Sequence, residues 1–241
     1  MNSTQLQLLG HASFKVTTPE GRIILVDPWI ADNPAIPNDL KTIDKVDLIL
    51  VTHGHEDHMD PDLPALLEKW NAKVVVNPIV RWYLLGKGVP ANRIEAMNLG
   101  GTISFFDLKV SMVNAFHIAH IPLSATEIGF PHSTVGFVIK LSDNISIYFA
   151  GDTSVFTDMK VIGDIYKPDI AVLPIGDRFT MGPLEAAYAI RLLNVKHVVP
   201  FHYGTWPMLA GTPEELKELT NDIADLHIYA LKAGEALNTH F

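Results

Sequence analysis

Residues Val46 to Asp60 read Val-Asp-Leu-Ile-Leu-Val-Thr-His-Gly-His-Glu-Asp-His-Met-Asp, and this segment is the most informative part of the sequence. Its first half, residues 46–51, is apolar and β-branched apart from Asp47 and contains neither Gly nor Pro, which predicts a buried strand. The apolar residues that follow recur at helical spacing from Leu63 to Trp70 and predict a helix. The polar second half of the stretch therefore lies on a tight loop between a buried strand and a helix.

Three histidines and an aspartate crowd this loop. They are His53, His55, Asp57 and His58, with Gly54 between the first two. Neutral imidazole and carboxylate are ligands that Zn prefers and that Mn and Fe also accept. Chance clustering in a polar loop is the other interpretation, but a cluster this dense directly after a strand is typical of a metal or catalytic site. The sequence therefore predicts metal binding, by a loop that can turn its ligands towards two neighbouring ions.

The segment His53-Gly-His55-Glu-Asp57-His58 resembles the His-x-His-x-Asp-His signature of the metallo-β-lactamase superfamily. Within it, the chain looks similar to a branch of poorly characterised bacterial and archaeal metal-dependent hydrolases. That branch is similar to the ascorbate-6-phosphate lactonases and, more distantly, to a phospholipase D that acts on N-acyl ethanolamine phospholipids. The resemblance runs from Gly10 to about Trp206.

The fold that this resemblance implies is an α/β fold, an αββα sandwich of two mixed β-sheets flanked by helices. The pattern of the chain agrees, because predicted strands precede predicted helices twice over and each candidate ligand follows a strand. At 241 residues there is no room for an accessory domain, so we expect one hydrolase domain over residues 1–241.

The resemblance also implies seven ligands shared between two divalent metal ions. They are His53, His55 and His117 for the first ion, Asp57, His58 and His202 for the second, and Asp152 as a bridge between both. A carboxylate suits the bridging position because each of its two oxygens can bind one cation. We expect Zn, with Mn, Fe or Ni as alternatives, because the sites of histidine and aspartate accept all of them.

Further candidates lie around these ligands. Asp57 is expected to manage a proton as well as bind metal, and His11 or His132 to protonate the leaving group. The resemblance includes a Gly-His-x-Ser turn like the one at His11, which implies that His11 supports a metal ligand or faces the substrate; an ordinary polar residue in a turn is the other interpretation. Asp27, followed by a proline, matches a superfamily aspartate that supports the metal loop; a simple turn former is the other interpretation.

Two loops are expected to shape the substrate pocket. The segment from Ile118 to Ser133 is long, partly apolar and interrupted by prolines, which predicts a loop without secondary structure that covers the pocket. Its His120 or His132 would then touch the substrate; packing against a neighbouring subunit is the alternative. The loop from Asp177 to Gly182 follows a predicted strand and is expected to form pocket wall. The remaining histidines are expected to be ordinary surface or structural residues: His197, His227 and His240.

The expected activity is hydrolysis of an ester-type bond, in a lactone or a phosphodiester. Two ions would lower the pKa of a shared water from 15.7 to about 7, so no serine or cysteine nucleophile is needed. A di-iron oxidoreductase is a weaker alternative, because its relatives carry Glu where this chain has His55. A non-enzymatic metal-binding protein is the other alternative, and it would be expected to have lost ligands, whereas all seven are present.

The composition limits the partners. A net charge of −9 argues against general nucleic-acid binding, while a metal site can still attract an anionic small-molecule substrate. The absence of cysteine fits a reducing compartment, and no signal peptide or membrane span is apparent, so we expect a cytoplasmic protein. A homo-oligomer is compatible with the sequence.

Overall fold

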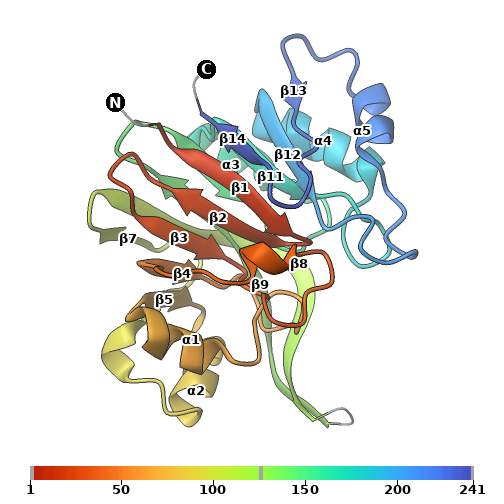
Figure 1. Ribbon diagram of the computed structural model, residues 1–241. Helices are drawn as coiled ribbons and strands as arrows, with labels where there is room; N and C mark the ends of the chain where they lie inside the picture. Colours follow the sequence, from red (N-terminus) through yellow and green to blue (C-terminus); the bar gives the residue numbers. More distant parts are fainter. Residues whose placement is uncertain (1–2, 125–126, 240–241) are drawn as a thin grey trace.

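The computed structural model describes residues 3–124 and 127–239 (Figure 1). Within these residues, two seven-stranded sheets pack face to face and five α-helices cover their outer faces. This is the expected αββα sandwich. It arises because the central strands of both sheets are apolar and buried on both faces, so each sheet needs a partner sheet on one side and helices on the other.

The first sheet contains both ends of the described chain. Its strand order is β14-β1-β2-β3-β4-β5-β6. The strands are β1 (Gln5–Gly10), β2 (Ser13–Thr17), β3 (Ile23–Val26), β4 (Leu48–Leu50), β5 (Lys73–Val76), β6 (Ile94–Ala96) and β14 (Ala236–Asn238). The pairs from β14 to β3 are antiparallel and those from β3 to β6 are parallel, so the sheet is mixed.

The second sheet has the same mixed character. Its order is β13-β12-β11-β10-β9-β8-β7, parallel from β13 to β10 and antiparallel from β10 to β7. The strands are β7 (Thr102–Phe105), β8 (Leu108–Ser124), β9 (Glu127–Lys140), β10 (Ser146–Phe149), β11 (Ile170–Pro174), β12 (His197–Phe201) and β13 (His227–Ile228).

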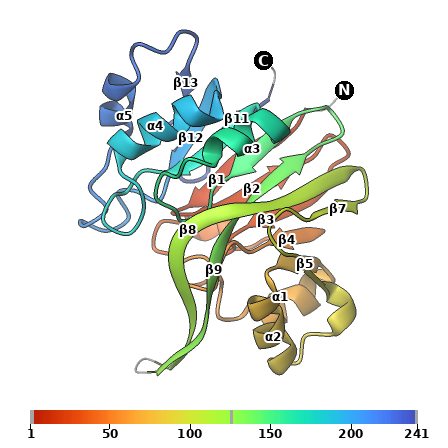
Figure 2. The same cartoon turned by 180° about the vertical axis from the view of Figure 1, so that it is seen from behind.

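The helices divide between the two outer faces (Figures 1 and 2). On the first sheet lie α1 (Leu63–Trp70) and α2 (Pro78–Gly86), and on the second lie α3 (Met159–Tyr166), α4 (Pro183–Leu193) and α5 (Pro213–Leu219). Two short 3₁₀ turns cover Asn38–Leu40 and Ala91–Arg93. None of the helices in the described part of the chain is long and apolar enough to cross a bilayer.

The core between the sheets is aromatic near the predicted metal loop. Phe14 of the first sheet contacts Phe149 and Phe201 of the second edge-to-face, with 5.8 Å between ring centroids in both pairs. Such contacts add to the burial energy of the rings and hold the facing strands at a fixed separation. Because β10 and β12 end just beyond these rings, their following loops are fixed relative to the first sheet.

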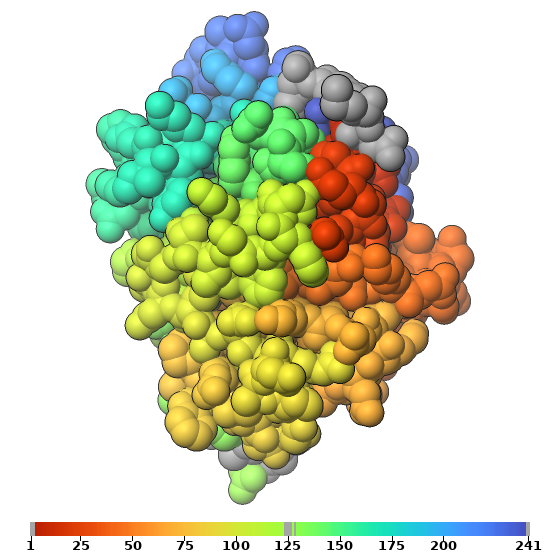
Figure 3. Space-filling view, turned by 90° about the vertical axis from the view of Figure 1, so that its left-hand side faces the viewer, coloured from red at the N-terminus to blue at the C-terminus, as the bar shows by residue number. Residues whose placement is uncertain are grey.

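The prediction of a loop without secondary structure from Ile118 to Ser133 is wrong. Its described residues continue β8 and β9 as a long antiparallel hairpin, here called the arm, which projects from the body of the molecule (Figure 1). In the space-filling view the far end of the arm emerges past α2 (Figure 3). The prolines that suggested a loop are accommodated because the strand pairing shifts register in three places, where a ladder bond can be omitted.

Two further elements were not expected from the sequence. Helix α3 has eight residues, lacks a side-chain N-cap bond and buries Met159 and Ile162 against the second sheet. Strand β14 pairs with β1 through Leu6 and Leu237, a contact between the two ends of the chain that local pattern cannot reveal.

Candidate metal centre

All seven predicted ligands meet at one end of the sandwich. His53, His55, Asp57 and His58 follow β4, whereas Asp152 follows β10 and His202 follows β12. His117 does not close a strand as expected. It lies within β8 where the pairing with β9 shifts register between Asn114 and Ile118, and this irregularity turns its ring inwards.

Three imidazoles form the first group. Nε2 of His53 lies 3.1 Å from Nδ1 of His55, and Nε2 of His117 lies 3.3 Å from the same nitrogen. Oδ2 of Asp152 completes the group, at 3.9 Å from Nε2 of His53 and 3.8 Å from Nε2 of His117. Four lone-pair atoms thus surround one small volume, as a tetrahedral metal site requires.

The second group shares Asp152 with the first. Oδ1 of Asp152 lies 3.2 Å from Nε2 of His58, and its Oδ2 lies 3.3 Å from Nε2 of His202. Nε2 of His202 is also 3.6 Å from Oδ2 of Asp57. One carboxylate therefore reaches both groups of imidazoles.

The buried donor atoms of the second group test whether a cation fits. Oδ1 of Asp152 and Nε2 of His58 and His202 are buried and lie within ion-pair distance of one another's side chains, but none of them has the geometry of a hydrogen bond to another described atom. Buried polar atoms left without a partner carry a large desolvation cost. A divalent cation bound by all three would remove that cost, so the donor set fits a metal ion.

Asp27 sets the orientation of two ligands, in agreement with its expected supporting role. Its Oδ2 lies 2.8 Å from Nδ1 of His58 and also accepts a hydrogen bond from Oγ1 of Thr52 at 2.7 Å. Because the Thr52 hydroxyl donates to Asp27, it accepts from Nδ1 of His53 at 2.9 Å. Both imidazoles therefore carry a hydrogen on Nδ1, which leaves Nε2 as the nitrogen whose lone pair could bind a metal ion, the usual arrangement behind metal-bound histidines.

The pKa values divide the histidines into two kinds. Burial holds the pKa of His53 well below 6.5 and lowers that of His55 to about 4, so both rings are neutral and ready to bind metal. Burial also opposes charge on His58 and His202, but Asp152 outweighs it and raises the pKa of His58 well above 6.5 and that of His202 to about 9. In the metal-free protein, protons on these two rings therefore balance the carboxylates.

His11 lies behind Asp57. Its Nε2 is 3.2 Å from Oδ2 of Asp57 and its Nδ1 is 2.8 Å from Oγ1 of Thr205. The ring is wedged edge-on against Trp206, with 4.9 Å between centroids, and burial lowers its pKa to about 4. Thr205 also borders a pocket of about 370 Å³ whose walls include Gly10 and His11. A chain of three polar side chains thus leads from a predicted ligand to this pocket.

His132 and His120 take different positions at the base of the arm. Both ring nitrogens of His132 lie within hydrogen-bond distance of backbone atoms, namely N of Gly54 at 3.0 Å and O of Phe130 at 2.8 Å. His120 packs its ring edge-on against His55, with 4.9 Å between centroids.

Two hydroxyl groups of the site were missed by sequence reasoning besides Thr205. Thr52 links Asp27 to His53, and Thr153 accepts a hydrogen bond from the backbone N of Phe116 at 2.9 Å, which places His117 beside Asp152. Each directly adjoins a ligand in the sequence, which is the only signal that could have identified them. The loop from Asp177 to Gly182 contacts the same segment, because N of Met181 donates to O of Thr153 at 2.9 Å.

Two of the three remaining histidines lie apart from the predicted ligands, and the third is not among the residues that the structure describes. His197 and His227 stack on neighbouring strands β12 and β13, with 5.3 Å between ring centroids, and Nδ1 of His197 lies 3.0 Å from the hydroxyl of Tyr229. They are not brought into the metal centre. His240 falls outside the described residues.

Comparison with known proteins agrees with this geometry. Residues 22–203 match the family described as the β-lactamase superfamily domain. A metal-dependent hydrolase of the UPF0173 group from Rubrobacter xylanophilus is 43% identical over 240 residues, covering 99% of this chain and 98% of the relative. Another from Caldivirga maquilingensis is 45% identical over 235 residues, covering 97% of both.

A solved structure extends the likeness to the whole fold. Igni18, a metallo hydrolase from the archaeon Ignicoccus hospitalis, superposes with a TM-score of 0.83 at 29% identity and covers 100% of both chains. The match extends over both sheets and their helices, and the curated relatives share the full length. The chain therefore belongs to the metallo-β-lactamase superfamily and, within it, to the UPF0173 metal-dependent hydrolases.

Proposed function

We propose that this hydrolase works with two divalent ions and cleaves an ester-type bond. The observation that carries the proposal is the convergence of two donor groups on one carboxylate. His53 and His117, which both lie beside His55, face Oδ2 of Asp152, while His58 faces its Oδ1 and His202 its Oδ2. Asp57 adds a second carboxylate beside His202. When bound, two such ions supply an activated water and polarise the oxygen on which charge develops.

The side chains around the ligands favour water as the nucleophile. The hydroxyl of Thr52 donates to Asp27, and that of Thr153 donates to the backbone O of Ser154 at 2.7 Å. The chain has no cysteine. Both hydroxyls are fully buried, and each oxygen also accepts a hydrogen bond, from Nδ1 of His53 and from N of Phe116 respectively, so neither is presented to a substrate.

Asp57 and His11 are proposed to handle the proton. Asp57 lies at the edge of the second group, and its carboxylate accepts from Nε2 of His11, whose Nδ1 accepts in turn from the Thr205 hydroxyl. A neutral imidazole can pass a proton by gaining it at one nitrogen and releasing it from the other. His11 would thus move a proton between Asp57 and the pocket beside Thr205.

The proposed substrates are lactones or phosphodiesters, as the resemblance to ascorbate-phosphate lactonases and to a phospholipase D suggests. Two cations favour a substrate whose reacting carbonyl or phosphoryl oxygen gains negative charge, and they also favour an anionic substrate overall. The identity of the ions, the single domain, the cytoplasmic location and a homo-oligomeric assembly stay predictions.

The test is turnover of a panel of lactones and bis-nitrophenyl phosphate by metal-replete protein, with and without a chelator. We expect chelator-sensitive hydrolysis of one of the two substrate classes, abolished in Asp152→Ala. Turnover that persists at full rate after chelation and dialysis against metal-free buffer would refute the mechanism. A metal-replete protein inactive on every member of the panel would refute the proposed ester-type substrates.

A further inference from the structure

The arm is fixed to the metal loop at its base by one histidine. Nε2 of His132 lies 3.0 Å from the backbone N of Gly54, the residue between the ligands His53 and His55. A backbone N–H can only donate, so Nε2 accepts and carries no hydrogen. Nδ1 therefore carries it and donates to O of Phe130 at 2.8 Å. Both nitrogens are committed to the backbone, in one tautomer.

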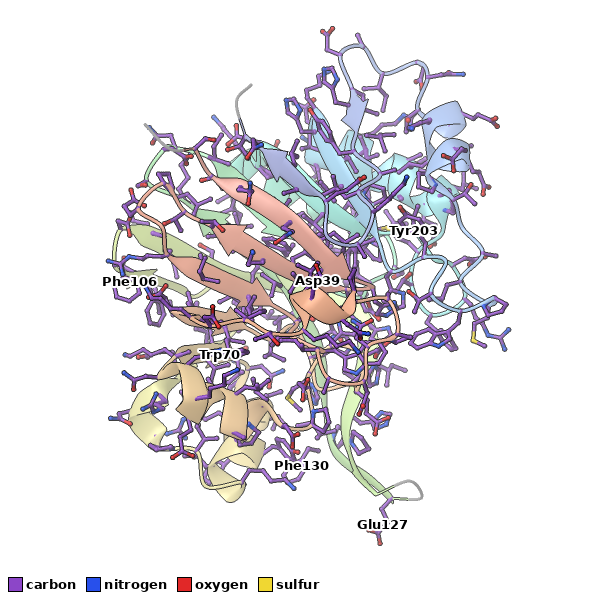
Figure 4. All side chains as sticks on the ribbon, in the orientation of Figure 1. Asp39, Trp70, Phe106, Glu127, Phe130 and Tyr203 are labelled. Atoms are coloured by element: carbon purple, nitrogen blue, oxygen red, sulfur yellow. The ribbon has the colours of Figure 1, made fainter. Side chains whose placement is uncertain are left out.

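The backbone of the arm is shaped to make this contact. Between the pairs Ala119–His132 and Ile121–Gly129, β9 contains one residue more than β8. This bulge includes Phe130, whose φ of 48° is rare for a bulky residue. A bulge re-aims the side chains beside it, and here it directs His132 at the metal loop. Phe130 packs near α2, with 5.9 Å between its ring centroid and that of Tyr83, whereas Figure 4 places Glu127 at the far end of the arm.

Gly54 has no room for a side chain at this contact. A Cβ built on Gly54 would stand 2.3 Å from Cγ1 of Ile121 and 3.2 Å from Cε1 of His132. Ile121 is itself 1% exposed and packs among the core residues under α1 and α2. Asn77, which caps α2, adds a hydrogen bond to O of Ser133 at 3.2 Å. The base of the arm is thus packed and bonded, which rules out a hinge at this level.

We propose that His132 is a positioning residue that fixes the His53–Gly54 peptide and thereby sets the two imidazoles of the first metal group. The N–H that donates to His132 belongs to the peptide bond between His53 and Gly54. Rotation of this planar peptide would therefore move His53 and His55 relative to each other. This role replaces proton donation to a substrate, because no ring nitrogen of His132 is left free. The inference rests on the proposed function for its consequence, but the contact itself does not require a metal.

The first experiment measures hydrogen exchange of the Gly54 amide in metal-free protein and uses two amide variants as a matched pair. The side-chain oxygen of His132→Gln is as many bonds from Cα as Nε2 of histidine, so it can still accept the hydrogen bond from Gly54. The oxygen of His132→Asn is one bond closer to Cα, at the position of Nδ1, and falls short of Gly54. We expect exchange about tenfold faster in His132→Asn than in the wild type, and near wild-type exchange in His132→Gln. Equal exchange in all three proteins would overturn the proposal.

Nitrogen NMR of His132 in the wild type covers the case in which a variant fails to fold. The proposal requires the tautomer with hydrogen on Nδ1, and a ring with hydrogen on Nε2 would overturn it.

The second experiment measures metal affinity by competition with a chelator. We expect His132→Asn to bind one of its two ions roughly 10- to 100-fold more weakly, with the affinity restored in His132→Gln. Wild-type affinity for both ions in His132→Asn would overturn the positioning role. A wild-type protein that binds no metal while its Gly54 amide stays protected would instead refute the proposed function and leave the contact with His132 established.

Discussion

At the residue scale, the metal centre is built on backbone turns that few residues adopt. His11, Asp27 and His202 each follow a strand and have positive φ values of 56°, 48° and 58°. The left-handed backbone conformation costs a non-glycine residue of order 1–3 kcal/mol. Such residues persist where the surrounding structure holds them in place, and they cluster at functional sites. At each of these positions the strand stops abruptly and the side chain turns into the site.

The role of Asp27 in holding His58 and Thr52 can be tested directly. In Asp27→Ala, Nδ1 of His58 and the hydroxyl of Thr52 lose their shared acceptor, so ligands in both metal groups are released. We expect metal affinity to fall roughly 10- to 100-fold, measured by chelator competition. Asp32→Ala, at an exposed position of the following loop, is the matched control and should bind metal like the wild type. Unchanged affinity in Asp27→Ala would contradict the orienting role.

His11 is expected to affect turnover more than metal content. His11→Gln keeps a polar side chain at the position but removes the ring that connects Asp57 with Thr205. We expect kcat to fall about 100-fold, as is usual for loss of a proton-transfer group, while elemental analysis finds the wild-type metal content. A variant with full kcat would exclude His11 from proton transfer, and one that loses metal would make it a ligand support instead.

The raised pKa of His202 predicts how the stability of the metal-free protein depends on pH. Its pKa is raised from 6.5 to about 9 by Asp152, so the folded state binds this proton more tightly than the unfolded state does. The resulting stabilisation is complete below pH 6.5 and is lost as the pH rises through about 9. The melting temperature of metal-free protein should therefore fall over this range. In metal-loaded protein this fall should be absent, because a metal-bound imidazole carries no such proton. A metal-free melting temperature that does not change over the range would contradict the assignment.

The sequence predicted which histidines and aspartates converge, but not the side chains that support them. A dense pattern such as His53-Gly54-His55 is visible locally and is tied to a recognisable family signature. The contacts of Thr52, Thr153 and Thr205 depend on chain segments distant in sequence, and threonine is common enough that no pattern marks these three. Sequence also suggested a catalytic His132, because nothing local shows that both its nitrogens face backbone atoms.

At the element scale, the arm shows why a proline-containing segment was misread. Pro122 and Pro131 suggested a loop, yet their neighbours pair across β8 and β9 from Ala119–His132 to Ser124–Glu127. Strand pairing is decided by the partner strand, and register shifts leave places where proline fits. By contrast, α1 and β4 were predicted well, because the helical spacing of apolar residues in α1 and the continuous apolar run around β4 are visible locally.

The packing of the arm on the metal loop gives a prediction about a pair of residues. Gly54→Ala would press its Cβ against Cγ1 of Ile121 and should displace the loop, lowering both thermal stability and metal affinity. Ile121→Ala removes the obstructing atom. In the double variant, we expect the effect of Gly54→Ala on metal affinity to be smaller than in the wild-type background, measured as a double-mutant cycle. Strictly additive effects would contradict the close packing.

At the scale of the whole molecule, the two sheets act as a frame that brings distant ligands together. His53 comes from the first sheet, whereas Asp152 and His202 come from the second, so the metal centre bridges the sandwich. Metal binding should therefore stabilise the entire fold. One ion at a free concentration of 100 times its Kd adds about 2.7 kcal/mol to the unfolding free energy. We expect the melting temperature to rise with added metal in the wild type and to rise less in Asp152→Ala. Equal rises in the two proteins would contradict a centre shared between the sheets.

One carboxylate, that of Asp152, is proposed to join two groups of imidazoles into a site for two ions. The most direct measurement is the number of metal ions per chain, by elemental analysis of protein reconstituted with Zn or Mn and freed of unbound metal. We predict two ions per chain in the wild type and fewer than two in Asp152→Ala. One ion or none in the reconstituted wild type would contradict the two-ion centre.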